Sequence, residues 1–156
     1  MNSENKRLID LYPYRINRNL PEFLLLRRAS GKIYSDQWRM VGGKCKTGET
    51  RSEAALRELQ EETGLLPSLF WCVPTINHFY EPQSDAIHLI PAFAAEIERG
   101  MQIELDDEHV EFGWFSLEEA ESRVIWPEQK RIIACISRII REGHIAKDWI
   151  IDTQHI

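Results

Sequence analysis

Three glutamates crowd one short stretch of the sequence, residues 41–65, which reads VGGKCKTGETRSEAALRELQEETGL. Glu58, Glu61 and Glu62 lie within five positions of one another, with a double glycine ahead of them and Gly64 behind. Like charges three and four residues apart destabilise a helix by a few tenths of a kcal/mol per pair. Carboxylates held together against this repulsion are suited to binding a hard divalent cation such as Mg²⁺, which prefers oxygen ligands.

The residues around the glutamates predict the helix that must position them. Thr50 is a good N-cap, and Glu53 three residues later would complete a capping box. Gly64 occupies the place of a C-terminal cap, so we expect a helix over residues 51–63. On a helical wheel the three glutamates share an arc of about 100° that borders the face packed on a sheet. We therefore expect the carboxylates to face a cleft beside the sheet edge.

Two further features support a ligand-binding interpretation of this stretch. We expect Gly42 and Gly43 to let the backbone turn tightly and approach a ligand, so that a bare carbonyl could reach a metal. Arg57 flanks the acidic arc and could orient or partly neutralise one glutamate. Glutamate-rich spacing such as ELQEE is, however, common on solvated helix faces, so the glutamates alone do not establish a metal site.

The rest of the chain supplies strands and two more helices. We expect strands at residues 11–16, 23–27, 38–41, 69–74, 76–80, 86–96 and 110–115. Ser116 would cap a short helix over residues 117–123. Trp126 and Pro127 open a last helix whose isoleucines form one apolar face. This order predicts an α/β fold in which helices cover a mixed sheet on both sides.

Length and composition are those of an ordinary globular protein. The chain has 156 residues, of which 43% are hydrophobic and 28% are charged, and we expect a single domain over residues 1–156. No apolar run approaches the ~20 residues of a membrane helix. The N-terminal segment breaks its apolar run too early for a secretory signal. We therefore expect no membrane partner.

Charge and cysteine usage exclude other classes of protein. The net charge of −6 argues against generic nucleic-acid binding, which needs a basic face. An acidic protein can still bind an anionic small molecule if it carries divalent cations. Cys45, Cys72 and Cys135 show no CxxC pairing, so neither a disulfide framework nor a zinc knuckle is indicated. A reducing cytoplasm is the expected location.

The spacing of the central motif resembles the complete Nudix box. The defining positions are all filled with the correct gaps, at Gly43, Glu49, Arg57-Glu58-Leu59, Glu61-Glu62 and Gly64-Leu65. The resemblance implies an α/β/α sandwich and a hydrolase of nucleoside diphosphates linked to another moiety, with Mg²⁺ or Mn²⁺ as cofactor. One departure is visible, because Val41 stands where many relatives have proline before the double glycine.

The resemblance also implies roles for individual residues. Glu58, Glu61 and Glu62 would bind the metal, and the carbonyl of Gly42 would be a further ligand. Arg57 would hold Glu58 in place. In the same motif, Gly43, Glu49 and Gly64 would shape the loop and the end of the helix, with Glu49 bracing the loop against the helix.

Hydrolysis also needs a group that accepts a proton from the attacking water. In similar proteins this group is often an acidic residue in the loop before a later strand, which here reads ELDDEHVE over residues 104–111. Glu108 is the first choice, followed by Glu111 and Asp107. Two alternatives remain open: Glu58 could itself be the base, and the loop could be only a solvated acidic turn.

Recognition of the rest of the substrate is assigned to residues outside the box. Arg27 and Arg28 follow an apolar strand and could reach phosphate, although either could simply be solvated. Gln129 lies in PEQKRII, which is similar to the last helix of triphosphate-cleaving relatives, where an amide can read a base edge. Aromatic residues that could stack on a base, or could equally be core, are Trp38, Trp126, Tyr34, Phe79 and Tyr80.

The leading hypothesis is a Mg²⁺-dependent pyrophosphohydrolase that cleaves a nucleoside triphosphate to a monophosphate and pyrophosphate. The segments LYPYRI, FLLLRR and WRMVGGK also resemble those of the dATP and dihydroneopterin-triphosphate branch. Alternatives are a nucleoside-diphosphate-sugar or dinucleoside-polyphosphate hydrolase, a nucleotide sensor without turnover, and an isoprenoid-diphosphate isomerase, for which Cys72 would have to be catalytic. The expected partner is a small nucleotide, and a homodimer is left open.

Overall fold

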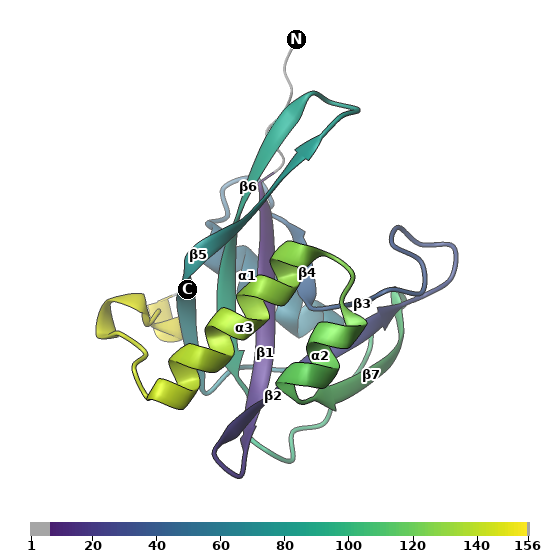
Figure 1. Ribbon diagram of the computed structural model, residues 1–156. Coiled ribbons are helices and arrows are strands. Elements are labelled where there is room, and N and C mark those ends of the chain that lie inside the picture. Colours follow the sequence, from purple (N-terminus) through teal and green to yellow (C-terminus); the bar gives the residue numbers. More distant parts are fainter. Residues whose placement is uncertain (1–6, 156) are drawn as a thin grey trace.

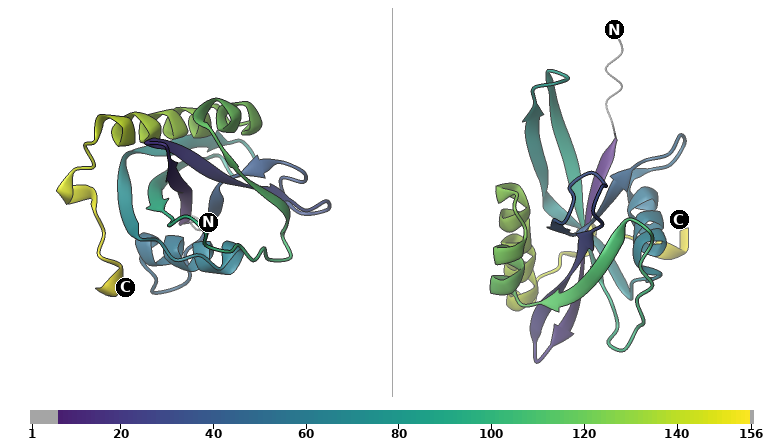
Figure 2. Two further views of the ribbon diagram at one scale, coloured as in Figure 1. Left: turned by 90° about the horizontal axis from the view of Figure 1, so that it is seen from below. Right: turned by 90° about the vertical axis from the view of Figure 1, so that its right-hand side faces the viewer.

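A mixed sheet of seven strands lies between two layers of helices in the computed structural model, which describes residues 7–155 (Figure 1, Figure 2). Helix α1 (Arg51–Thr63) covers one face of the sheet. Helices α2 (Leu117–Arg123) and α3 (Pro127–Glu142) cover the other face. The expected α/β/α sandwich with a mixed sheet is therefore confirmed. Within the described residues, no helix is both long enough and apolar enough to cross a bilayer.

Strand β1 (Leu8–Asn17) is central and exchanges one neighbour for another halfway along its length. Its first half pairs antiparallel with β4 (Val41–Lys44), and its last residues pair antiparallel with β2 (Leu20–Arg28). Its opposite edge runs parallel to β6 (Ala86–Glu96). Strands β2 and β4 thus follow each other along the same edge of β1, and β2 is free to diverge toward other partners.

The remaining strands extend the sheet at its two ends. Strand β5 (Leu69–Glu81) pairs antiparallel with β6. Strands β3 (Trp38–Arg39) and β7 (His109–Phe115) both pair antiparallel with β2. Two 3₁₀ turns, η1 (Lys147–Trp149) and η2 (Thr153–His155), follow the last helix.

Alternation of side chains along β1 divides the interior into two cores, because successive residues of a strand face opposite sides of the sheet. Ile9 and Leu11 belong to the core under α1. Tyr12 and Tyr14 belong to the core under α2 and α3. The expected apolar face of the last helix packs on this second core through Ile132, Ile133 and Ile136. The sequence pattern of that helix is therefore confirmed.

The double glycine differs from its expected conformation. Gly42 and Gly43 lie in strand β4, paired with Asp10 and Ile9, and neither forms the tight turn predicted from the sequence. The turn prediction was wrong because pairing with β1 keeps this segment extended. Because the two glycines have no side chains, neighbouring groups can approach the backbone of β4 closely on both of its faces.

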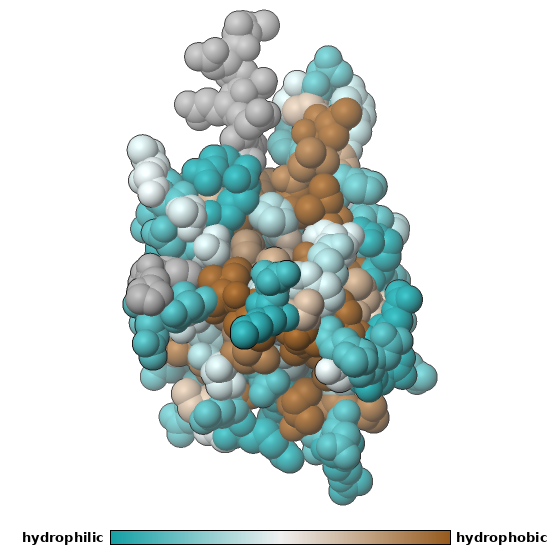
Figure 3. Space-filling view, turned by 90° about the vertical axis from the view of Figure 1, so that its left-hand side faces the viewer, coloured by the Kyte–Doolittle hydropathy of each residue, from teal (hydrophilic) through white to brown (hydrophobic). Residues whose placement is uncertain are grey.

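Strand β5 is one long strand rather than the two that were predicted. Its pairing with β6 is irregular between Cys72 and Ile76, where the sequence contains Pro74, and then resumes. Beyond this point β5 and β6 form a two-stranded hairpin that projects from the body of the sheet (Figure 1). Apolar side chains lie along this hairpin on the face seen in Figure 3, and its exposed large residues are Ile76, Tyr80, Ile87 and Leu89.

The predicted helix ends are confirmed with one exception. The Thr50 side chain accepts a hydrogen bond from the Glu53 backbone nitrogen at 3.2 Å, and Gly64 caps α1 in the left-handed conformation at φ 74°. The Glu53 carboxylate accepts from the Thr50 hydroxyl instead of the Thr50 backbone, so the capping box is only half formed. Ser116 and Glu119 form the complete box at α2.

Candidate active site

Arg57 is the centre of the polar contacts at the start of the motif. Its Nε and Nη2 atoms donate to the Glu49 carboxylate at 2.7 and 3.0 Å, and Nη2 also donates to the Lys44 carbonyl at 2.8 Å. Its Nη1 donates to Glu58 Oε1 at 2.8 Å and to Glu61 Oε2 at 3.1 Å. One guanidinium group therefore meets three carboxylates and offsets the repulsion between them. Within the helix, Arg57 thus offsets the repulsion between Glu58 and Glu61.

Glu58 and Glu62 form a buried carboxylate pair. Burial raises the pKa of Glu62 to about 10, and the negative charge of Glu58 adds to this shift. Burial also raises the pKa of Glu58. Within the described residues, Glu62 Oε2 is enclosed and has no hydrogen-bond partner. A Cβ atom at Gly43 would collide with the Glu58 carboxyl group, so only glycine leaves room for this pair.

Glu61 does not join this pair. Its side chain is 51% exposed and contacts Arg57 and, at 3.9 Å, Lys46. The three carboxylates share a helix face as predicted, but they do not converge on one point. Within residues 7–155, no three Asp, Glu, His or Cys side chains are grouped closely enough to hold a metal ion as they stand. Of the three glutamates, Glu58 and Glu62 are therefore the two that the fold brings together.

The chemistry of this pair fits the divalent cation that the Nudix box implies. Carboxyl groups whose pKa is raised by burial are stabilised in the ionised form by a nearby positive charge. Carboxylate and carbonyl oxygens are also the ligands that Mg²⁺ takes in proteins. Gly42, whose carbonyl was the predicted further ligand, lies next to Gly43 in β4, and the Gly43 backbone lies against Glu58.

His109 contacts the buried pair and had no expected role. Its Nε2 lies 3.4 Å from Glu62 Oε1, and its Nδ1 lies 2.7 Å from Asp106 Oδ1. The His109 and Glu62 side chains are 1% and 4% exposed. Asp106 and His109 are three residues apart, but the sequence carries no sign that this spacing points toward α1. Only the fold brings the end of the acidic loop against the helix.

The acidic loop and the two arginines of β2 pair with one another. Arg28 Nη1 lies 3.1 Å from Glu108 Oε2, and Arg27 Nε lies 2.9 Å from Glu111 Oε2. Arg27 also contacts Asp36 at 3.2 Å. The side chains of Glu108 and Glu111 are about half exposed, at 53% and 54%. Both arginines are therefore already paired, and a phosphate group would have to share them with these carboxylates.

A second polar group lies on the other face of β4, under the start of α3. Asn77 Nδ2 donates to Asp10 Oδ2 at 3.0 Å, and burial raises the pKa of Asp10 to about 6. Three enclosed atoms have no hydrogen-bond partner within the described residues: Tyr12 Oη, Arg39 Nη1 and Gln129 Oε1. Tyr12 and Arg39 interact electrostatically with Asp10, and Gln129 lies in the first turn of α3. Buried polar atoms in native proteins are almost always paired with protein, water or ligand. This group is therefore a candidate for contacts with a ligand.

The double glycine lies between this polar group and the carboxylate pair. A Cβ atom at Gly42 would lie 3.7 Å from Asp10 Oδ1, whereas one at Gly43 would meet Glu58. Successive residues of a strand face opposite sides, so β4 has the carboxylates on one face and Asp10 on the other. A side chain at Gly43 would therefore collide with Glu58, whereas one at Gly42 would contact Asp10 at an ordinary van der Waals distance.

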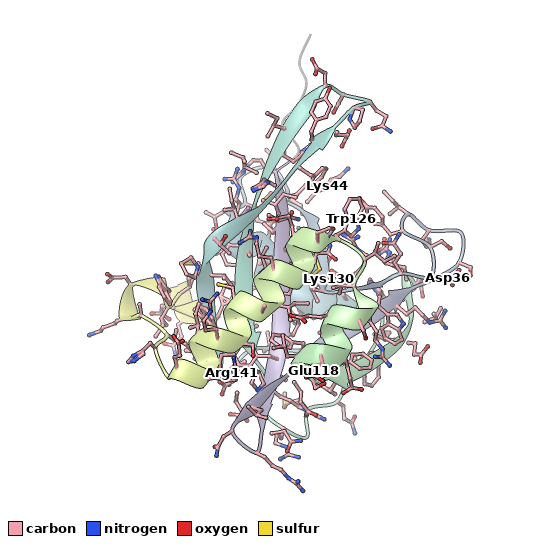
Figure 4. All side chains as sticks on the ribbon, viewed as in Figure 1. Asp36, Lys44, Glu118, Trp126, Lys130 and Arg141 are labelled. Carbon is pink, nitrogen blue, oxygen red and sulfur yellow. The ribbon has the colours of Figure 1, made fainter. Side chains whose placement is uncertain are left out.

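Aromatic side chains border the second polar group. The Arg39 guanidinium lies 4.0 Å above the Tyr34 ring, and the Trp126 ring is 6.2 Å from Tyr34 and 6.3 Å from Phe79. Figure 4 shows Trp126 at the start of α3, between the β5–β6 hairpin and the loop that carries Asp36. Three of the predicted stacking residues, Trp126, Tyr34 and Phe79, are thus brought together.

The structure places two other predicted stacking residues elsewhere. Trp38 packs edge-to-face on Phe115, at 5.3 Å and 85°, as part of the core under α2 and α3. Tyr80 is near the tip of the hairpin, where its hydroxyl donates to Asp85 at 2.8 Å. Arg39 and Tyr12, in contrast, were not predicted. The sequence shows that an arginine and a tyrosine occupy these positions. It does not show that their polar atoms are buried, because burial depends on the surrounding fold.

One known family model matches most of the chain. The model of the NUDIX domain matches residues 13–135. The chain belongs to the Nudix hydrolase family. The resemblance of residues 43–65 to the Nudix box is thereby confirmed, and the match extends over the sheet and most of α3.

Individual Nudix relatives differ in their named substrates. A mouse protein named bis(5′-nucleosyl)-tetraphosphatase (asymmetrical) is 30% identical over 125 residues, which cover 79% of this chain and 78% of the relative. A mouse oxidized purine nucleoside triphosphate hydrolase is 28% identical over 110 residues, covering 69% and 67%. A mutator protein of Mycobacterium tuberculosis is 24% identical over 104 residues, and this match spans 66% of the chain but only 42% of the relative.

The Nudix fold is also shared with solved structures. The chain resembles a C. elegans Ap4A hydrolase crystallised as a binary complex, with a TM-score of 0.71 and 21% identity, over 88% of this chain and 99% of the other. At this level of identity the likeness concerns the fold. The layered arrangement of sheet and helices in Figure 2 is therefore that of the family.

Proposed function

We propose that this Nudix protein is a divalent-cation-dependent pyrophosphohydrolase that cleaves a nucleoside triphosphate to a monophosphate and pyrophosphate. One observation carries the proposal. The buried pair Glu58 and Glu62 lies on one face of the double glycine, and the polar group around Asp10 lies on the other. A nucleotide has the matching division into a phosphate chain and a base. The name of the mouse oxidized purine nucleoside triphosphate hydrolase supports the same substrate class.

The carboxylates and the Gly42 carbonyl would hold the cation. Glu62 would supply a buried carboxylate, Glu58 a partly buried one and Glu61 an exposed one at the rim. A bound Mg²⁺ or Mn²⁺ neutralises phosphate charge and lowers the pKa of bound water. Arg57 fixes the direction of the Glu58 carboxylate, and Glu49 fixes Arg57 through two hydrogen bonds. These residues therefore prepare the site before substrate arrives.

Glu108 is our proposed proton acceptor. Its carboxylate is half exposed, and Arg28 holds it from the neighbouring strand at 3.1 Å. The next residue, His109, contacts Glu62, so the loop that carries Glu108 is tied to the cation-binding helix. Glu111 is held in a similar way by Arg27, and it remains the second choice. Asp107 and Glu58 remain further alternatives.

Base recognition is proposed for the group under the start of α3. Arg39 offers only donors, and Gln129 Oε1 is an unpartnered acceptor. Guanine presents acceptors at O6 and N7, which arginine pairs with, together with N–H donors on its other edge. Trp126 and Tyr34 can stack against such a base. This arrangement favours a guanine-type base over adenine.

A dinucleoside polyphosphate is the second candidate substrate. The support for it is the 30% identity to the mouse bis(5′-nucleosyl)-tetraphosphatase. The partly exposed aromatic residues around Trp126 could hold a base at the rim of the site. A nucleoside-diphosphate sugar remains a third candidate. All three substrates contain the pyrophosphate bond, so the site described here serves each of them.

The test is a panel of purine nucleoside triphosphates, a diadenosine tetraphosphate and a nucleoside-diphosphate sugar, assayed with Mg²⁺ for the products released. Release of monophosphate and pyrophosphate from a triphosphate, at the highest kcat/KM of the panel, supports the proposal. Preference for the tetraphosphate would replace the first candidate by the second. No turnover of any member by the wild type, with Glu62→Gln as blank, would overturn the assignment as a pyrophosphohydrolase.

A further inference from the structure

Asp106, His109 and Glu62 form a chain of polar side chains that runs from the acidic loop to α1. The imidazole lies between two carboxylates, 2.7 Å from Asp106 Oδ1 and 3.4 Å from Glu62 Oε1. The His109 and Glu62 side chains are almost fully buried. Glu62 Oε2, the other oxygen of the same carboxyl group, has no partner within the described residues. One oxygen of Glu62 is thus approached by His109 and the other is left available.

The contact with Asp106 fixes which way the ring is turned. Nδ1 lies 2.7 Å from Asp106 Oδ1, which is within hydrogen-bonding distance. The ring is then held with Nε2 directed toward Glu62. The backbone nitrogen of His109 also donates to the Asp106 carbonyl at 3.4 Å, which closes a tight turn around the pair. Asp106 therefore acts on the orientation of the ring.

A local irregularity in β7 explains why His109 faces inward. Along β2, Arg27 pairs with Glu111 and the next residue, Arg28, pairs with His109. Val110 is therefore an extra residue in β7, as in a β-bulge, and bulges re-aim side chains near active sites. The irregularity leaves Glu108 exposed and turns His109 under it, against Glu62. A regular strand would not place both side chains in this way.

We propose that His109 is a positioning residue, which fixes Glu62 Oε1 so that Oε2 is presented to the divalent cation, with Asp106 setting the orientation of the ring. The proposal rests on the proposed function, because Glu62 is there a cation ligand. Partners of metal-binding carboxylates act by orienting them, and losing such a partner typically lowers metal affinity 10- to 100-fold. The same range is expected when His109 is replaced by a residue without a polar side chain.

The experiment measures Mn²⁺ binding to the nucleotide-free protein by electron paramagnetic resonance or calorimetry, beside urea unfolding in EDTA. His109→Leu should weaken Mn²⁺ binding by 10- to 100-fold, whereas His109→Gln, whose side-chain amide can take the place of Nε2 beside Glu62, should recover most of the affinity. Asp106→Ala tests the same contact without touching the buried ring, and should weaken binding by about 10-fold. It keeps the proposal testable if His109→Leu does not fold.

A matched control exists at the other end of the sheet. His88 is also largely buried, and its Nε2 lies 3.1 Å from Glu81 Oε2. His88→Leu should leave Mn²⁺ affinity unchanged. Folded His109→Leu and Asp106→Ala proteins that bind Mn²⁺ within roughly threefold of the wild type would overturn the positioning role alone. A wild type that binds no Mn²⁺, or a Glu62→Gln variant that binds it normally, would overturn the cation site and this proposal together.

Discussion

Arg57 donates two hydrogen bonds to the carboxylate of Glu49, from Nε at 2.7 Å and from Nη2 at 3.0 Å. Paired hydrogen bonds of this kind combine strength with a fixed geometry. They anchor the loop before α1 to the helix and leave Nη1 directed at Glu58 and Glu61. The orientation of the carboxylates proposed to bind the cation thus depends on a residue eight positions before Arg57.

Replacing Arg57 should damage catalysis although the charge is kept. Lysine is a point charge and cannot form the fork that meets Glu49 and Glu58 together. Arg57→Lys should lower kcat/KM by about 10- to 100-fold, which equals roughly 1.4 to 2.7 kcal/mol. Steady-state kinetics on the preferred nucleotide measure this. Arg51→Lys, at the exposed start of the same helix, is the matched control. Equal kinetics for the two variants would speak against the orienting role.

Glu62→Gln should lower the turnover rate and raise the stability of the metal-free protein. Turnover should fall by orders of magnitude, because the amide keeps the shape but loses the anionic ligand. In EDTA the variant should be more stable at pH 8, on the order of 1–3 kcal/mol, because a buried group no longer has to remain protonated or bear a charge. Kinetics at saturating Mg²⁺ and urea unfolding in EDTA test both parts. Near-normal turnover would show that Glu62 is not an essential ligand.

The sign of the Glu62 effect follows from its pKa, which burial raises from 4.5 to about 10. Between these values the folded protein binds a proton that the unfolded chain releases. The stability of the metal-free wild type should therefore fall as pH rises from about 4.5 toward 10. Glu62→Gln should flatten this part of the profile. Identical slopes in the two proteins would mean that Glu62 is not the titrating group.

Glu49 should give the opposite dependence on pH. The hydrogen bonds from Arg57, together with the Lys46 backbone nitrogen, lower the pKa of Glu49 from 4.5 to about 2. A lowered pKa stabilises the fold above about 4.5, and this contribution is lost as pH falls toward 2. Glu49→Gln should cost about 1 kcal/mol at pH 7, the scale of an ion pair that solvent can reach, and much less at pH 3.

Urea unfolding of Glu49→Gln at several pH values measures this difference. Glu98→Gln, an exposed residue in the loop after β6, is the control and should remain close to wild type throughout. A Glu49→Gln difference that stays constant from pH 7 to pH 3 would argue against the pairing with Arg57 as its cause.

Glu108→Gln should lower kcat with little change in KM. A general base acts in the transition state, so its loss affects the chemical step more than substrate binding. Because Arg28 holds Glu108, the amide should remain in place and the fold should be preserved. The pH profile of kcat should also lose its acidic limb. A variant that only raises KM would move the role to Glu111 or Glu58.

Gln129→Ala should change base selection more than the rate of bond cleavage. Gln129 is 2% exposed and its Oε1 has no partner within the described residues, so the side chain is placed to accept from a base edge. The ratio of kcat/KM between guanine and adenine triphosphates should shift by about 1–3 kcal/mol, the scale of one specific base contact. Kinetics on the two nucleotides side by side give this ratio. An unchanged ratio would make Gln129 a structural residue.

The local features of the motif could be predicted from the sequence because they depend on neighbouring residues. The N-cap at Thr50, the left-handed cap at Gly64 and the shared helix face of Glu58 and Glu62 all follow from spacing within one helix. The apolar face of α3 follows from periodicity, and the two-sided covering of the sheet follows from the order of strands and helices. Spacing also carried the resemblance to the Nudix box.

Only the tertiary structure decided which side chains meet across the chain. It placed His109 against Glu62, 47 positions earlier in the sequence, since an extra residue in β7 turns the imidazole inward. It turned Glu61 toward solvent and Arg57. It gathered Asp10 and Asn77 beneath α3, because β1 and β5 present them on the same side of the sheet. Such contacts depend on strand register and on burial. Both are properties of the folded chain, and the residue types of one segment do not determine them.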